Sequence, residues 1–166
     1  MTQNHTSWCQ SAATWRAILF GYAPFVFAAH LAWEIAQLPL YTIWTEGTAG
    51  EIAFAVIHCT VGDLMIALSA LALALIATRS GELAEWNLVL VGALTVAIGL
   101  GYTIASERLN VGLVRWTYAD AMPVVPVLEV GLSPLAQWIA VPLAAFWLLA
   151  RRRRSAPGGE LRGYRA

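Results

Sequence analysis

The 166-residue chain is 59% hydrophobic and only 12% charged, and its formal net charge is zero. Soluble domains carry about 25% charged residues, so a chain this poor in charge cannot cover a water-facing surface. The chain has no lysine and no basic stripe, which argues against nucleic acid as a partner. Composition therefore predicts an integral membrane protein.

Four apolar runs are each long enough to cross a bilayer as a helix. A span needs about 20 apolar residues, because each helical residue rises about 1.5 Å. Only helices satisfy their own backbone in lipid over such continuous runs. We therefore expect an all-α, four-helix transmembrane domain over residues 1–154, with spans at about 17–38, 52–77, 86–106 and 133–150. Residues 155–166 are typical of a disordered cytoplasmic tail.

Arginine predicts how these helices are oriented. Four consecutive arginines, from Arg151 to Arg154, follow the last apolar run directly, whereas the TEGTAGE loop after the first run has no positive residue. Positively charged flanks of membrane helices stay in the cytoplasm. With four spans, both termini are expected in the cytoplasm of a bacterial inner membrane, and the TEGTAGE loop on the outer side.

The segment 107–132, ERLNVGLVRWTYADAMPVVPVLEVGL, is too polar and too rich in proline for an ordinary span. A connection of this length usually has a function of its own. We expect a short interfacial helix here, followed by an extended or re-entrant segment that folds over the outer end of the bundle.

Four ionisable side chains interrupt the apolar runs, His30, Glu34, His58 and Asp63, and a fifth, Glu107, directly follows the third run. A charged residue at the bilayer centre costs about 2.5–3.5 kcal/mol, and such residues face the bundle interior or a cavity. His30 and Glu34 lie four residues apart and share one helix face. Counted from the middle of each run at about 1.5 Å per residue, all five fall between the midplane and the outer surface. This bias favours a site over structural hydrogen bonds or ion pairs between helices, which are the alternative.

Aromatic and basic side chains near the same level are candidate ligand-binding residues. Aromatic faces can wall a lipophilic cavity, although membrane aromatics also serve as interface anchors. With His58, the candidates are Trp33, Tyr102, Arg108, Arg115, Trp116, Tyr118 and Trp138.

Three functions fit this constellation. In the first, His30, Glu34, Asp63 and Glu107 form an acid–base site for a membrane lipid or isoprenoid, since burial suits such groups to proton transfer near neutral pH. In the second, His30 and His58 bind haem, or with Glu34 a metal ion. In the third, the chain is a non-catalytic carrier that pairs with a second copy, or an accessory subunit that docks into a larger membrane complex. The residues specify no cofactor, and no metal site is assigned.

Two resemblances bear on these alternatives. HLAWE, HCTVGDL and the segment from SERLNVGL to SPLAQW resemble a group of small uncharacterised bacterial multi-pass membrane proteins over about residues 25–145. The H-x3-E pair of His30 and Glu34, with four spans, is similar to the superfamily of the sterol isomerase and the sigma-2 receptor. That resemblance implies a ligand cavity lined by His30, Glu34, and Glu107 or Asp63. In this chain the pair lies on the first span, where the isomerase does not have it.

Overall fold

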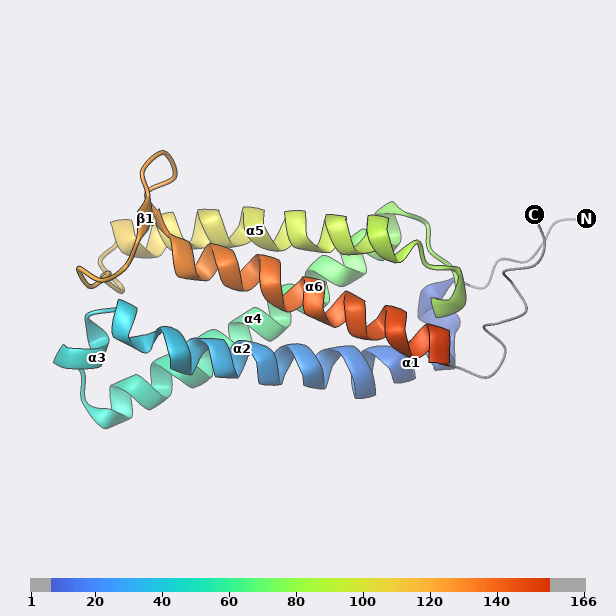
Figure 1. The fold of residues 1–166 in the computed structure, drawn as a ribbon, viewed down its shortest axis with the longest axis horizontal. Coiled ribbons are helices and arrows are strands. Elements are labelled where there is room, and N and C mark those ends of the chain that lie inside the picture. Colours follow the sequence, from blue (N-terminus) through green and yellow to red (C-terminus); the bar gives the residue numbers. More distant parts are fainter. Residues whose placement is uncertain (1–6, 156–166) are drawn as a thin grey trace, which may run out of the picture.

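The computed structural model describes residues 7–155 and consists of four long helices packed into one bundle (Figure 1). The helices that could cross a membrane by length and composition are Ala12–Leu40, Ala49–Ala77, Leu88–Gly112 and Leu132–Arg154. The predicted four-helix membrane bundle is therefore confirmed. Of the predicted tail, only Ser155 lies within the described residues, where it ends the last helix.

The first span is composite. After a 3-10 turn, η1 (Trp8–Gln10), it consists of α1 (Ala12–Ala17), a π-helical turn η2 (Ile18–Tyr22), α2 (Ala23–Gln37) and a 3-10 turn η3 (Leu38–Leu40). Pro24 stands in the first turn of α2. Proline has no N–H for the α-helical ladder, and the widened π-helical turn lies directly before it.

The second span has a strong start signal. A short helix, α3 (Ile43–Glu46), precedes α4 (Ala49–Ala77). Thr48 and Glu51 form a capping box at the start of α4: the Thr48 backbone N–H donates to Glu51 Oε2 at 2.8 Å, and the Glu51 N–H donates to Thr48 Oγ1 at 3.3 Å. This cap fixes the start of α4, three residues before the predicted beginning of the span at 52.

The third and fourth spans are joined through the proline-rich segment 107–132. A 3-10 turn, η4 (Leu83–Glu85), leads into α5 (Leu88–Gly112), and Asn87 caps α5 by accepting the Leu90 N–H at 3.1 Å. A two-stranded antiparallel hairpin of β1 (Val124–Val125) and β2 (Val130–Gly131) then leads into α6 (Leu132–Ser155).

The predicted interfacial helix in this segment is wrong. Glu107 and Arg108 belong to α5, and residues 113–131, all of them described, contain no helix. Helix α5 can continue past residue 106 because the next proline is Pro123 and because Glu107 and Asn110 bury their side chains against the bundle. We call residues 113–131 the strap. It crosses the end of the bundle, where the Ala119 N–H donates to Leu40 O at 3.0 Å and the Thr42 N–H to Thr117 O at 3.1 Å.

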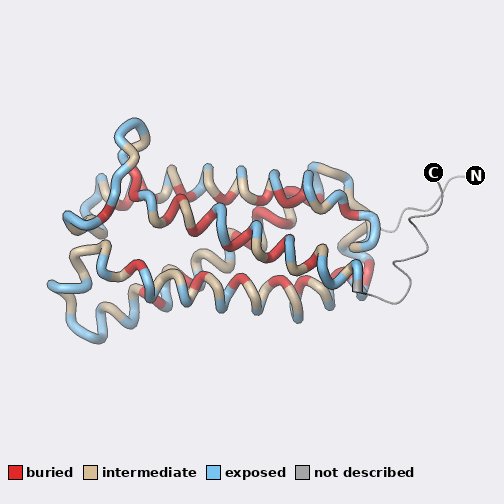
Figure 2. Tube along the Cα trace, viewed as in Figure 1, coloured by how far each residue is buried: buried red, intermediate tan, exposed pale blue. Residues whose placement is uncertain are grey.

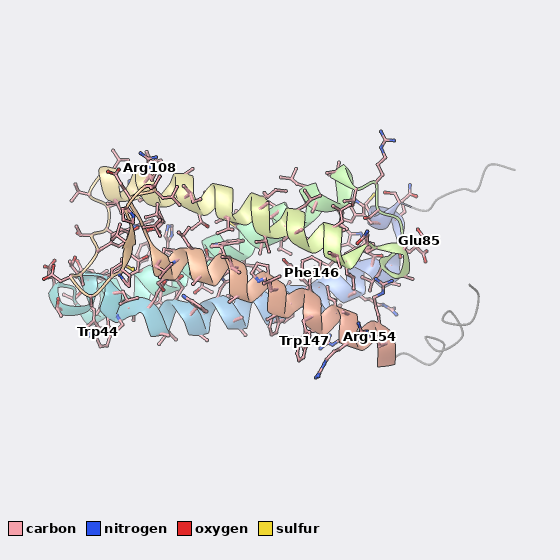
Figure 3. The ribbon with its side chains drawn as sticks, turned by 45° about the horizontal axis from the view of Figure 1, so that its top comes forward. Trp44, Glu85, Arg108, Phe146, Trp147 and Arg154 are labelled. Atoms are coloured by element: carbon pink, nitrogen blue, oxygen red, sulfur yellow. The ribbon has the colours of Figure 1, made fainter. Side chains whose placement is uncertain are left out.

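The two ends of the bundle differ. Residues 8–17, 78–87 and 150–155 form one end, the arginine end, and residues 38–48 with the strap form the other, the cavity end. Figure 3 shows Glu85 and Arg154 at the arginine end, and Trp44 and Arg108 at the opposite end. Between the ends, the buried residues follow the inward faces of the helices (Figure 2).

Helix packing is tight toward the arginine end and opens toward the cavity end. The apolar core is built from residues such as Val26, Leu71, Val91 and Phe146, which lie on the arginine side of the helices. Helices α4 and α5 pack against each other there and diverge toward the cavity end (Figure 1). The divergence leaves space inside the cavity end of the bundle.

Candidate functional site

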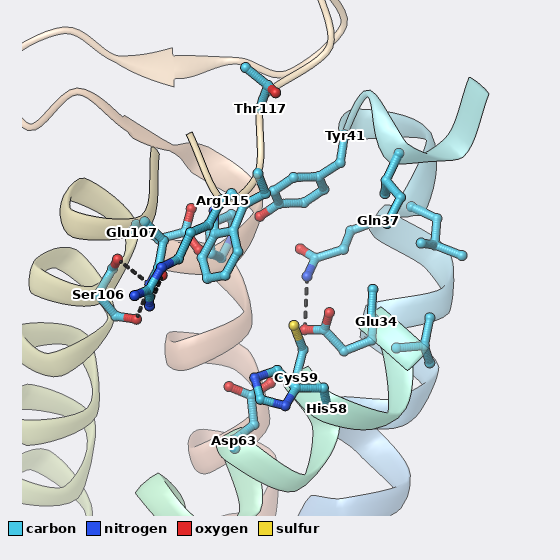
Figure 4. Close-up of a pocket in the computed structure, with 18 of the residues that line it drawn as sticks. Glu34, Gln37, Tyr41, His58, Cys59, Asp63, Ser106, Glu107, Arg115 and Thr117 are labelled. Atoms are coloured by element: carbon cyan, nitrogen blue, oxygen red, sulfur yellow. Dashed lines mark hydrogen bonds between the residues drawn. The ribbon is translucent and has the colours of Figure 1, made fainter. Parts of the chain in front are cut away.

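A cavity of about 890 Å³ occupies the cavity end of the bundle (Figure 4). Its walls come from α2, α3, α4, α5 and α6 and from the first residues of the strap. Sites for small molecules range from about 300 to 1,000 Å³, and they are mostly apolar with a few convergent polar groups. This cavity has aromatic walls, made by Tyr41, Phe54, Tyr102, Trp116 and Trp138.

Gln137 of α6 joins three ionisable groups at one side of this cavity. Its side-chain nitrogen lies 2.9 Å from His30 Nδ1, 3.0 Å from Glu34 Oε1 and 3.0 Å from Asp63 Oδ2. These partners come from α2 and α4, so one buried amide links three helices. We call His30, Glu34, Asp63 and Gln137 the Gln137 cluster. The predicted meeting of His30, Glu34 and Asp63 is thus present in the structure.

A second row of hydrogen bonds holds Glu34 in place. Gln37 Nε2 donates to Glu34 Oε1 at 2.8 Å, and Ser133 Oγ donates to Gln37 Oε1 at 2.8 Å. Trp33 Nε1 donates to Ser133 Oγ at 3.1 Å, so Trp33 supports the site from outside the cavity. The spacing of His30, Glu34 and Gln37 at i, i+4 and i+7 places all three on one face of α2.

His30 is the most deeply buried member of the cluster. Its side chain is fully buried, its Nδ1 lies 3.3 Å from Asp63 Oδ2, and its ring packs on Trp138 with centroids 5.2 Å apart. Its Nε2 has no hydrogen-bond partner among the described residues. His30 does not line the cavity, whereas Glu34, Asp63 and Gln137 do.

Glu107 lines the α5 side of the same cavity and is held by the strap. The Tyr118 hydroxyl donates a hydrogen bond to Glu107 Oε2 and accepts one from the Gly131 N–H at 3.0 Å. The Trp116 indole lies beside the same carboxyl group. Burial, and then the hydrogen bond to Glu107, raise the pKa of Tyr118, so its phenol stays neutral and can donate.

The remaining predicted residues occupy different places. Tyr102, Trp116 and Trp138 are wall residues. Arg115 also lines the cavity, and its Nη1 donates to Asn110 Oδ1 at 3.3 Å. Arg108 lies outside the cavity, on the surface, 3.8 Å from Glu129.

His58 borders the cavity from an exposed position on α4. It stacks on Phe54, with ring centroids 5.4 Å apart, and does not join the buried Gln137 cluster. The five-residue offset between His58 and Asp63 turns them to different sides of the helix, since each residue advances about 100°. Within residues 7–155, no three His, Cys, Asp or Glu side chains form a group that could hold a metal ion.

Sequence reasoning missed the residues that organise the site. Gln137, Gln37 and Ser133 carry no charge, and an uncharged polar side chain in a membrane span is a weaker sign of a site than an ionisable one. Gln137 was detectable in principle, because it is the one amide within the apolar run SPLAQWIAVPLAAFWLLA. Cys59 of the second apolar run also lines the cavity, and a single thiol in a span predicts no particular role.

Chemically, the site combines a hydrophobic wall with groups that can give or take a proton. The cavity does not continue toward the arginine end, since the last residue of α4 that lines it on that side is Ile66. Among the described residues, no Asp, Glu, His, Lys or Arg is buried between Asp63 and the arginine end. The arrangement can therefore hold an apolar body against aromatic rings while carboxyl and amide groups contact a polar end.

No protein-family model, curated protein or solved structure matches the chain. What the helices and their composition show is a four-span helical membrane protein.

Proposed function

We propose that this protein binds a lipophilic small molecule, a membrane lipid or an isoprenoid, in the cavity and converts it by acid–base chemistry. The observation that carries the proposal is the Gln137 cluster: Glu34 and Asp63 converge on one buried amide at the side of an aromatic-walled cavity of about 890 Å³. Carboxyl groups inside a membrane bundle cost free energy, and proton transfer to a bound molecule is a use for them.

The arrangement is prepared before any molecule binds. Glu34 Oε1 accepts hydrogen bonds from both Gln37 and Gln137, and Gln37 is itself held by Ser133. Such second-row contacts fix the orientation of a reacting group and reduce the cost of ordering it on binding.

The apolar half of the bundle favours binding or conversion over a proton-coupled carrier. A carrier must expose its site to both sides of the membrane in turn. Toward the arginine end, the described core is filled by side chains such as Leu71, Leu75 and Phe146, and it offers no buried charged relay. The site is accordingly a pocket that opens at one end.

We also propose the orientation and location of the protein. The tetra-arginine sequence at the end of α6 and the loop containing Arg79 lie together at the arginine end, which the positive-inside rule assigns to the cytoplasm. In a bacterial inner membrane the cavity then opens toward the periplasmic side. The resemblance to the sterol isomerase and sigma-2 receptor superfamily agrees with a cavity that contains carboxyl groups, and membership of that superfamily is part of this proposal.

Native mass spectrometry of the full chain, extracted with its surrounding lipid, tests the binding. We expect a lipophilic molecule to be retained by the wild type and by Glu85→Gln, whose exposed side chain lies at the arginine end. Glu34→Gln and Asp63→Asn should reduce retention at least tenfold. If both variants melt at a lower temperature but retain the molecule as the wild type does, the carboxyl groups are structural and the proposal fails.

Conversion is tested separately on the retained molecule. Incubation of the loaded wild type in D2O should place deuterium on a carbon atom of that molecule, because a conversion that moves a double bond or adds to one transfers a solvent proton to carbon. Glu34→Gln should slow this incorporation, whereas Glu85→Gln should not. If the wild type incorporates no deuterium, the conversion is contradicted and only the binding part of the proposal is retained.

A further inference from the structure

We propose that the Gln137 cluster stores one proton at neutral pH, shared between the carboxyl groups of Glu34 and Asp63 and exposed to the cavity. The stored proton makes this side of the cavity a hydrogen-bond donor. It therefore selects a lipophilic ligand whose polar end is a hydroxyl or carbonyl oxygen; this last step rests on the proposed function.

The inference starts from where the carboxyl groups lie. Glu34 Oε1 and Asp63 Oδ2 each lie 3.0 Å from the same nitrogen of Gln137, which also lies 2.9 Å from His30 Nδ1. The hydrogens of Gln137, with one more that Gln37 donates to Glu34 Oε1, supply these acceptors. The two carboxyl oxygens are therefore at most about 6 Å apart, and the group between them is a neutral amide and not a cation.

The position of the carboxyl groups assigns this proton to the pair. The Glu34 and Asp63 carboxyl groups come from two helices and converge on the one Gln137 nitrogen, 3.0 Å from each. Two carboxylates that share a buried site cannot both ionise without strong repulsion. Both groups line the cavity, so the proton is accessible to a bound molecule.

His30 stands behind the pair as a second proton acceptor. Its Nδ1 lies 3.3 Å from Asp63 Oδ2 and its side chain is fully buried, so it reaches the cavity only through Asp63 or Gln137. We infer that His30 is a positioning residue, which orients the Asp63 carboxyl group.

The surroundings provide little positive charge that could hold a second carboxylate. The titratable groups that face the cluster are His30 and Glu34 on α2, Tyr41 between η3 and α3, His58, Cys59 and Asp63 on α4, and Glu107 on α5. From α6 the contributing side chain is the neutral Gln137. Among the residues that line the cavity the sole arginine is Arg115, which is engaged with Asn110. The charges around the pair are thus mostly acidic, which favours a retained proton.

Infrared spectroscopy of the full chain in lipid bilayers tests this inference. At neutral pH we expect the carbonyl band of a protonated carboxylic acid, shifted in D2O, with an intensity of one group per chain. Glu34→Gln and Asp63→Asn should each abolish the band, because the remaining carboxyl group ionises without its partner. Glu107→Gln is the matched control on the other wall and should keep it. Absence of the band in the wild type, or its persistence in both Glu34→Gln and Asp63→Asn, would overturn the inference.

If the variants do not fold, the infrared spectrum of the wild type alone tests the stored proton. Raising the pH should remove its band in a single one-proton step and lowering the pH should add a second group; a band that is absent throughout the neutral range contradicts the stored proton. Two further outcomes separate the proposals. If lipid retention depends on Glu34 and Asp63 but the wild type shows no carboxylic-acid band, the proposed binding is supported and the stored proton is refuted. If the band is present but lipid retention is the same without Glu34 and Asp63, the stored proton is supported and the proposed binding is refuted.

Discussion

Tyr118 donates a hydrogen bond to Glu107 and so ties the strap to α5 at the wall of the cavity. The strap is also attached to the other side of the bundle, because its backbone pairs with that of residues 40–42 around Tyr41 and Tyr118. Tyr118 thus joins the two sides of the cavity end, through its hydroxyl to α5 and through the backbone around it to residues 40–42. Its hydroxyl must be neutral to serve as the donor in this contact.

This contact predicts a loss of stability at alkaline pH. Burial and the hydrogen bond to Glu107 raise the pKa of Tyr118 above its ordinary value of about 10. The stabilisation is therefore complete below pH of about 10 and is lost as the pH rises toward the folded-state pKa. Thermal melts should show Tyr118→Phe about 1–2 kcal/mol less stable than the wild type at neutral pH.

The difference between these two proteins should shrink above pH of about 10, because the phenol then ionises in the unfolded wild type while the folded protein must still retain its proton. Tyr102→Phe is the control, because Tyr102 is an exposed residue of the cavity wall. A constant difference between wild type and Tyr118→Phe across the alkaline range would show that the hydroxyl does not act as the neutral donor.

Ser133 predicts a measurable coupling between α2 and α6. Its hydroxyl accepts from Trp33 Nε1 and donates to Gln37 Oε1, so Ser133→Ala removes one partner from each of two part-buried groups. We expect a loss of about 1–3 kcal/mol in the free energy of unfolding. Ser69→Ala, at an exposed position on α4, should change stability by less than about 0.5 kcal/mol. Equal melting temperatures for the two variants would contradict the network.

Gly99 predicts a steric limit on the position of Trp138. A Cβ atom at Gly99 would overlap the Trp138 ring, whereas one at Gly101 on the same helix would meet nothing within 4 Å. Gly99→Ala should therefore destabilise the protein by about 1–3 kcal/mol through overpacking and disturb the wall beside Gln137. Gly101→Ala should be neutral or slightly stabilising, because alanine favours a helix. Similar melting temperatures for both variants would mean that α5 and α6 pack less closely at Gly99.

The sequence was sufficient to predict the spans but not the organisation of the site. A continuous apolar run can satisfy its backbone hydrogen bonds in lipid only as a helix, so the four helices follow from hydropathy. Their ends differ from the predicted ones where a cap or a buried polar residue extends the helix, as Thr48 and Glu107 do. His30, Glu34 and Asp63 could be grouped because ionisable residues in spans are costly and turn inward.

The missing information concerned contacts between helices. Gln137 meets His30 across a separation of 107 residues, and helix periodicity cannot predict which faces of two separate spans will meet. The strap illustrates the same difficulty: its proline content correctly disfavoured a helix after residue 123, but its pairing with residues 40–42 depends on where the first span ends.

The proposed orientation makes a labelling prediction. In a chain whose two cysteines are replaced by serine, Arg154→Cys should react with a membrane-impermeant thiol reagent only after the cells are opened. Thr45→Cys, at an exposed position of the cavity end, should react in intact cells. The reverse pattern would place the arginine end outside and would turn the cavity toward the cytoplasm.

The central claim is that the cavity between α2, α4 and α5 holds a lipophilic molecule against the Gln137 cluster. A structure determined from protein extracted in native lipid tests it most directly. The account predicts elongated density inside the cavity, in contact with the aromatic wall, with one end within hydrogen-bonding distance of Glu34 or Asp63. A cavity that contains only water, or one closed by movement of α4 onto α5, would contradict it.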